Sequence, residues 1–271
     1  MSAGETPDRM HQATARELPV AEVTNQLRRL GVEEGGVLLV HTSFRAVRPI
    51  ADGPRGLITA LLAALGDEGT LVMPSWGSDD DTPFDPEATP VSPDLGVVAE
   101  SFRHLRGVQR SSHFHAFAAR GPAASRILAD PLPLPPHIPE SPAGRVHDLD
   151  GQVLLLGVGH DANTTLHLAE IVGGAPYRVP RYCTVLEGGQ ARRVEYLEND
   201  HCCERFALAD EWLRGADLQA EGPVGHAHAR LFRSRHIVEL AVSALRQDPL
   251  VFLHPPEAHC VDCDEARASV R

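Results

Sequence analysis

GQVLLLGVGHDANTTLHLAE, residues 151–170, is the stretch that decides the fold. It joins a continuous apolar run, Gln152–Leu156, to a glycine turn and then to a helix. An apolar run of this length is typical of a strand that is buried on both faces. Ligands of open α/β sheets bind beyond the carboxyl ends of such strands, so this turn is expected to border a functional site.

Apolar runs and amphipathic segments alternate on both sides of that stretch. Upstream, we predict strands at 37–40, at 70–74 and within 110–121, and helices at 18–30, 55–65 and 97–105. Downstream, we predict a β-hairpin within 176–197, helices at 206–213 and 229–245, and a last strand within 248–266. Buried runs alternating with helices predict an α/β fold with a mainly parallel central sheet and helices on both faces.

The chain shows no repeat and no interdomain linker. Residues 1–17 are polar and without periodicity, which predicts a disordered arm before a single domain at 18–271. Residues 130–142 contain six prolines and are expected to form an extended connector. The loop at 75–96 is long for a compact domain, and loops of that kind are usually functional or disordered.

Composition excludes several classes of protein. The formal net charge is −12, and all 25 basic residues are arginine, so a Walker P-loop, a Schiff-base enzyme and a lysine general base are excluded. The acidic balance argues against a nucleic-acid partner and suits a cationic one. The chain has no apolar run long enough for a membrane span, and its N-terminal residues lack an apolar signal region, which predicts a cytoplasmic protein without membrane contact.

The helix after the glycine turn carries the first candidate chemistry. His167 and Glu170 are three residues apart and therefore neighbours on one helical face, where a carboxylate can orient and polarise an imidazole. Such a pair suits a general base near neutral pH. An ordinary surface pair has the same spacing, and two metal ligands would as well, although no third ligand follows at a regular interval.

The turn at the end of the first strand is a second candidate. His41, Thr42 and Ser43 offer hydroxyls and backbone amides that suit a phosphate, a pantetheine amide or an oxyanion, although a simple capped loop has the same residues. The run GVG at 157–159 does not complete GxGxxG, so a Rossmann dinucleotide site is disfavoured. No GxSxG nucleophile elbow is present.

The cysteines raise the question of a metal. Cys260 and Cys263 form a CxxC pair in a tail too polar to bury itself, and such a pair is half of a tetrahedral zinc site. The alternative is that they are plain buried thiols. If zinc is bound, the site is expected to be structural, and only one of two adjacent cysteines should ligate. The candidates for the other two ligands are Cys202, Cys203, His254 and His259.

Long strings of this sequence resemble the aminoglycoside 3-N-acetyltransferases, an acetyl-CoA-dependent antibiotic-resistance family structurally distinct from the GNAT superfamily. The strings are GGVLLVHTSFRAVRP, GDEGTLVMPSW, GQVLLLGVGHDANTTLHLAE and YLENDHCCERFALADEWL. DPLPLPPHIPESP and HPPEAHCVDCDEA resemble the branch that accepts apramycin together with gentamicin- and tobramycin-type drugs. The likeness runs from about residue 20 to residue 268.

The resemblance implies transfer of acetyl from acetyl-CoA to the 3-amino group of a 2-deoxystreptamine ring. By match, His167 is the base, and Glu170 polarises it or contacts the drug amine. The coenzyme-side residues are His41, Thr42, Ser43, Phe44 and Arg45.

Residue chemistry agrees with this function. A polycationic drug needs carboxylates, and the acidic residues expected to supply them are Asp79, Asp80, Asp81, Asp161, Glu198 and Asp200. An exposed acidic loop that only faces solvent is the alternative for 79–81. We expect direct attack on the thioester, with Thr165 stabilising the oxyanion.

Two other functions stay open at this point: acetylation of a non-antibiotic amine, and a non-catalytic acidic module that sequesters cationic drugs. The sequence does not distinguish a monomer from a homodimer.

Overall fold

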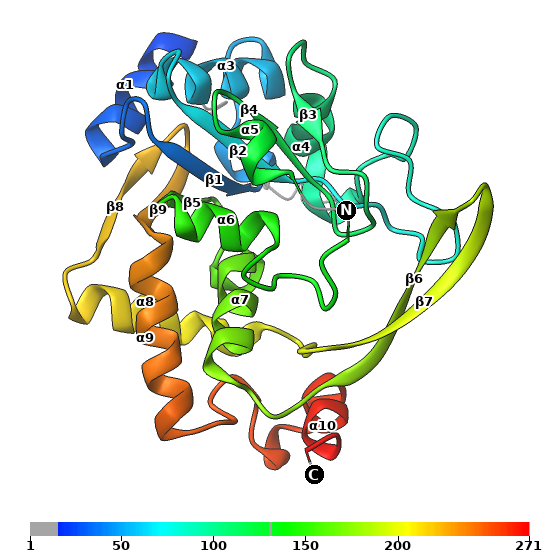
Figure 1. Cartoon of the computed structure of the whole chain (residues 1–271). Coiled ribbons are helices and arrows are strands. Elements are labelled where there is room, and N and C mark those ends of the chain that lie inside the picture. Colours follow the sequence, from blue (N-terminus) through cyan, green and yellow to red (C-terminus); the bar gives the residue numbers. More distant parts are fainter. Residues whose placement is uncertain (1–15, 130–131, 271) are drawn as a thin grey trace, which may run out of the picture.

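A mixed sheet with the strand order β3-β4-β2-β1-β5-β9-β8 organises the computed structural model, which describes residues 16–129 and 132–270 (Figure 1). The central strands β2, β1 and β5 are parallel, and the outer strands are added antiparallel. The strands are β1 (Val37–Thr42), β2 (Thr70–Pro74), β3 (Gln109–Arg110), β4 (Phe117–Arg120), β5 (Gln152–Leu156), β8 (Gln219–Val224) and β9 (Ala227–Arg233).

Two layers of helices cover the two faces of this sheet. Alternate residues of one strand belong to different layers, because successive side chains of a strand point to opposite faces. Leu38 packs in one apolar core and Leu39 in the other. The first core takes in α1 (Val20–Leu30), α3 (Gly53–Leu65) and α4 (Gly96–Arg103). The second takes in α5 (Ala124–Ile127), α6 (Pro142–Asp148), α7 (Thr164–Gly173), α8 (Leu208–Gly215), α9 (Ser234–Gln247) and α10 (Val261–Ala268).

The predicted α/β fold with a parallel centre and helices on both faces is confirmed. The chain leaves β1 for β2 on one side and later returns to β5 on the other side, so β1 lies where the order of strands reverses. Ligands of open α/β sheets bind at such a point, beyond the carboxyl ends of the strands. These ends are Thr42 in β1 and Leu156 in β5, which are paired in register.

A separate two-stranded ribbon extends from this body. β6 (Val179–Glu187) and β7 (Gln190–Glu198) form the predicted hairpin, turning at Gly188 and Gly189, both of which have positive φ. Figure 1 shows this hairpin arching away from the sheet toward the loop that follows β2. Tyr182 of β6 donates a hydrogen bond to Asp81 of that loop, with 2.9 Å between Tyr182 Oη and Asp81 Oδ1.

Two predictions about the C-terminal third were wrong. Residues 227–233 form strand β9 rather than the start of a helix, because they pair with β5 on one side and with β8 on the other, and Gly225 turns the chain between β8 and β9. The strand predicted within 248–266 is absent from the described part of the chain. That segment instead ends in helix α10, where Asp262 and Asp264 in the first turn favour a helix N-terminus.

The predicted arm at 1–17 lies almost wholly outside the described residues. None of the helices in the described ranges combines the length and the apolar character that a membrane crossing requires. The cytoplasmic location stays a prediction.

Candidate functional site

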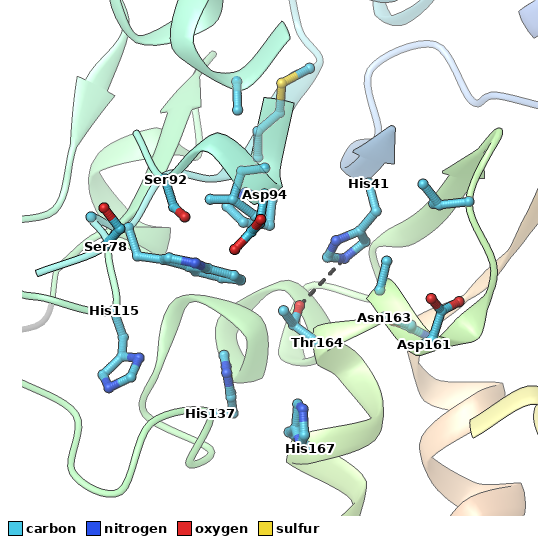
Figure 2. Close-up of a pocket in the computed structure, with 18 of the residues that line it drawn as sticks. His41, Ser78, Ser92, Asp94, His115, His137, Asp161, Asn163, Thr164 and His167 are labelled. Atoms are coloured by element: carbon cyan, nitrogen blue, oxygen red, sulfur yellow. Dashed lines mark hydrogen bonds between the residues drawn. The ribbon is translucent and has the colours of Figure 1, made fainter. Parts of the chain in front are cut away.

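A cavity of about 750 Å³ opens at the carboxyl ends of the parallel strands (Figure 2). Its walls come from the ends of β1 and β2, the loop after β2, the start of α7 and the end of β7. A second cavity of about 580 Å³ adjoins it on the side of α4. Both cavities are lined by Thr42, Asp94 and Val158, so two ligands bound in them would meet at these residues.

The predicted pair on α7 borders the larger cavity. His167 Nδ1 lies 2.8 Å from Glu170 Oε2, and the His167 side chain remains 21% exposed whereas that of Glu170 is 0% exposed. Asn163 caps this helix by accepting a hydrogen bond from the Thr165 N–H, which fixes where the helix begins. The three-residue spacing of His167 and Glu170 therefore brings the two side chains into contact, as the sequence predicted.

Glu170 is held by more partners than the sequence indicated. The Tyr177 hydroxyl donates to Glu170 Oε1, and His201 Nε2 lies 2.8 Å from the same oxygen. Burial opposes ionisation, but the hydrogen bonds from His167 and His201 keep the pKa of the Glu170 carboxyl below its ordinary value. Burial would likewise lower the pKa of His167, yet the Cys203 sulfur and the Glu170 carboxylate raise it well above the ordinary value. The result is an imidazole paired with a fixed negative charge.

Further histidines of the cavity were missed by the sequence reasoning. His137, in the proline-rich connector, stacks on His167 with ring centroids 5.4 Å apart and planes inclined by 15°. His115 Nε2 lies 2.8 Å from the hydroxyl of Tyr196 in β7. Burial lowers the pKa of His115 to about 3 and that of His137 as well, so both rings stay neutral. His137 stands alone among prolines, and His115 follows His113 at a spacing that points to no particular chemistry, so neither position carried a signal.

The residues predicted for the coenzyme divide between the cavities. His41 lines the larger cavity, Thr42 lines both, and Ser43, Phe44 and Arg45 line the smaller one. The lining of the larger cavity includes Thr164 but not Thr165, whose hydroxyl is buried without a hydrogen-bond partner among the described residues.

The predicted drug-binding carboxylates do not all reach the cavity. Those that line it are Asp80, Asp161, Glu198 and Asp200. Asp79 accepts a hydrogen bond from the backbone N–H of Asp81, and Asp81 holds Tyr182, so neither lines a described cavity. The sequence reasoning missed Asp94, although it stands in the same loop after β2.

The surroundings of two cavity carboxyl groups, those of Glu198 and Asp200, affect the charge that they carry. Burial raises the pKa of Glu198 to about 7. Asp200 pairs with Arg181 of β6, with 2.6 Å between Arg181 Nε and Asp200 Oδ2. Glu198 is therefore a carboxyl whose charge changes near neutral pH.

The structure separates the two adjacent cysteines. Cys203 Sγ lies 3.5 Å from His167 Nε2, whereas Cys202 Sγ lies 3.6 Å from Cys263 Sγ on α10. The ligand atoms of Cys202 and His254 lie within 4.8 Å of each other, and Cys260 precedes α10 as its N-cap. All five cysteines are free thiols. Cys260 and His259 belong to none of the metal-ligand clusters found among the described residues.

The chain is similar to known proteins in both sequence and structure. A family model described as aminoglycoside 3-N-acetyltransferase matches residues 39–246. Aminoglycoside N(3)-acetyltransferase IV from Salmonella sp is 68% identical over 237 residues, covering 88% of this chain and 91% of that protein. Aminoglycoside N(3)-acetyltransferase VII from Streptomyces paromomycinus is 31% identical over 261 residues, covering 83% of this chain and 90% of that protein.

Solved structures agree with the sequence relatives. The apoenzyme of aminoglycoside acetyltransferase AAC(3)-IVa superposes with a TM-score of 0.94 at 65% identity, covering 96% of this chain and 100% of that one. A histidine-to-alanine mutant of that enzyme, solved with apramycin, superposes with a TM-score of 0.88 at 62% identity, covering 93% of this chain and 100% of that one. The same kind of mutant was also solved with a gentamicin.

Proposed function

The chain belongs to the aminoglycoside 3-N-acetyltransferase family, and from that premise we propose that His167 is the general base of the acetyl transfer, oriented by Glu170. The enzyme uses acetyl-CoA to acetylate the 3-amino group of the 2-deoxystreptamine ring of aminoglycosides, and thereby confers resistance. The observation that carries the assignment is the 2.8 Å contact between His167 and Glu170 at the wall of a cavity lined by carboxylates.

The chemistry needs a base at this place. An aminoglycoside amine is protonated in water and must lose a proton before it attacks a thioester. Glu170 holds His167 Nδ1, so Nε2 is the nitrogen that faces the substrate, and the incoming amine replaces the Cys203 thiol as its partner. Stacking with His137 restricts rotation of the ring. No covalent acyl-enzyme is required, because both substrates reach the junction of the two cavities.

Each cavity suits one substrate. The larger cavity presents carboxylates to the ammonium groups of the drug, and Asp80, Asp161, Glu198 and Asp200 are the residues we assign to this contact. Asp94 adds a carboxylate at the junction. The smaller cavity, with Ser43, Phe44 and Arg45, is assigned to the pantetheine side of acetyl-CoA.

The assignment of His167 is tested by substitution. His167→Ala should lower kcat by about 100-fold or more, the scale expected for loss of a general base. The measurement is the release of CoA thiol that depends on added aminoglycoside, with the thermal melting temperature as a control for folding. A folded variant with near wild-type kcat would remove His167 from the mechanism.

We also propose a structural zinc ion bound by Cys202, Cys260, Cys263 and His254. Two sulfurs on a tetrahedral zinc, each about 2.3 Å from the metal, stand about 3.8 Å apart, and Cys202 Sγ and Cys263 Sγ are separated by 3.6 Å. His254 Nε2 lies 3.1 Å from Glu204 Oε2, the carboxylate contact that commonly orients a ligating imidazole and leaves its other nitrogen for the metal.

Neighbouring side chains are excluded from this set by their contacts. His201 lies close to Cys202 and Cys263, but its Nε2 contacts Glu170 and its Nδ1 accepts the Cys203 N–H. Cys203 faces His167. Four protein ligands leave no open position, so the ion would stabilise the fold without entering the reaction.

A further inference from the structure

A hydroxyl on the same helix face as His167 has no part in the steps described above. Thr164 is the first residue of α7 and stands three residues before His167, so the two side chains project from one face of the helix. Figure 2 shows both of them at the larger cavity, with His41 opposite Thr164. Among the described residues, His41 Nε2 is the single hydrogen-bond partner of Thr164 Oγ1, at 3.4 Å.

We propose that the Thr164 hydroxyl stabilises the oxyanion of the acetyl transfer, and that His41 is the positioning residue that orients this hydroxyl. The inference rests on the proposed function. The amine nitrogen of the drug forms a bond to the thioester carbon, the carbonyl electron pair moves onto oxygen, and His167 Nε2 takes the amine proton. When the carbonyl re-forms, the carbon–sulfur bond breaks and CoA thiolate leaves. A donor beside that oxygen lowers the barrier to its charged state.

His41 can orient Thr164 because it is rigid and neutral. It is 5% exposed and stands in β1, the strand at which the order of the sheet reverses. Burial and the neighbouring His160 lower the pKa of His41 to about 3, so the ring carries one N–H at working pH. With that proton on Nε2, His41 donates to Thr164 Oγ1. The threonine proton then has no acceptor in the described protein and is free for the substrate oxygen.

Two other hydroxyls compete for this role, and the backbone disfavours both. Thr165 is two residues from His167 on α7, so it points to the other side of the helix, and it does not line the cavity. The Thr42 hydroxyl is buried and unpartnered in the described structure. Thr42 directly follows His41 in β1, however, and successive side chains of a strand point to opposite faces of the sheet. His41 faces α7, so the Thr42 side chain turns from that helix toward the junction of the two cavities, and Thr42→Val is therefore the competing variant in the test.

The test replaces each hydroxyl by a methyl group of the same shape, in Thr164→Val, Thr165→Val and Thr42→Val. Thr164→Val should lower kcat by about 100-fold, as expected for loss of one oxyanion donor. Its KM for aminoglycoside and its calorimetric Kd for CoA should stay within about threefold of wild type, because the ground state does not use this hydrogen bond. Thr164→Ser keeps a hydroxyl and should recover most of kcat, and Thr165→Val should keep it. Melting temperatures establish that each variant is folded.

The positioning role has its own variants. His41→Ala should lower kcat, whereas His41→Gln, whose side chain carries an N–H near the position of Nε2, should restore part of it. His41→Ala added to Thr164→Val should cause little further loss, because the two residues act through one hydrogen bond.

Near wild-type kcat in folded Thr164→Val overturns the inference. A Thr164→Val variant that only binds CoA more weakly overturns it too. The same holds if kcat falls in Thr42→Val instead of in Thr164→Val. A wild-type enzyme without drug-dependent CoA release would overturn the proposed function as well, which separates the two failures.

Discussion

Glu170 is the residue whose charge controls the proposed base. His167 must be neutral to accept a proton, and its pKa lies well above 6.5 because Glu170 and Cys203 favour the protonated ring against the effect of burial. The activity of the wild-type enzyme should therefore rise with pH along a limb centred above 6.5.

Glu170→Gln removes the negative charge and should move this limb to lower pH, while kcat on the alkaline plateau falls by less than in His167→Ala. The measurement is kcat/KM for aminoglycoside as a function of pH. Residual activity of His167→Ala, which lacks the titrating ring, serves as the control, because any limb that it keeps comes from the amines of the drug. An unchanged limb in Glu170→Gln would contradict the assignment.

The raised pKa of the Glu198 carboxyl leads to a separate prediction about drug binding. Its pKa of about 7 means that the carboxyl is neutral below this pH and negative above it. Wild-type affinity for an aminoglycoside should therefore exceed that of Glu198→Gln at about pH 8, with a smaller difference at about pH 6, because only the ionised form pairs with an ammonium group. The amines of the drug titrate identically in both experiments, so the comparison isolates Glu198. An equal ratio of wild-type to Glu198→Gln affinity at the two pH values would contradict a role for Glu198 in drug binding.

The loop between β2 and α4 is the element that brings Asp80 and Asp94 to the larger cavity, and its aspartates differ in their contacts. Asp80 lines the cavity, whereas Asp79 bonds to the backbone of its own loop. Neutralising residues 79–81 together should raise KM for aminoglycoside and flatten its dependence on salt, with KM for acetyl-CoA little changed. Asp80→Asn alone should reproduce most of this effect, and Asp79→Asn is the matched control. If the triple variant keeps the wild-type KM for drug, the loop is only a solvated surface and Glu198 and Asp200 supply the contact.

At the scale of the whole molecule, the cluster of proposed zinc ligands connects the C-terminal helix α10 to the chain that follows β7. This cluster consists of Cys202, Cys260, Cys263 and His254. A zinc ion there would add its binding free energy to the stability of the fold. Protein purified without a histidine tag should contain about one zinc per chain. Removal of the ion by a chelator, or Cys202→Ser, should lower the melting temperature, while kcat of the molecules still folded stays close to wild type.

Cys183→Ser provides the matched control, because this buried cysteine lies in β6 outside the cluster. Less than about a tenth of a zinc per chain, with a melting temperature indifferent to chelator, would disprove the site.

Local interactions explain what the sequence by itself determined. The buried strand Gln152–Leu156, the turn after it and the His167–Glu170 pair depend on residues within about one turn of one another, and periodicity and spacing report such contacts directly. The parallel centre of the sheet followed from the same apolar runs. The acidic composition pointed to a cationic partner before any contact was known.

Only the tertiary structure decided which distant groups meet. Glu170 contacts His201, 31 residues away, and Cys202 contacts Cys263, 61 residues away. No local periodicity encodes such pairs, because they arise when packing of the helices on the sheet brings remote segments together. For the same reason β9 was mistaken for a helix, since its strand conformation depends on pairing with β5 and β8. The chain's local chemistry thus specified the His167–Glu170 pair, and long-range packing specified its surroundings.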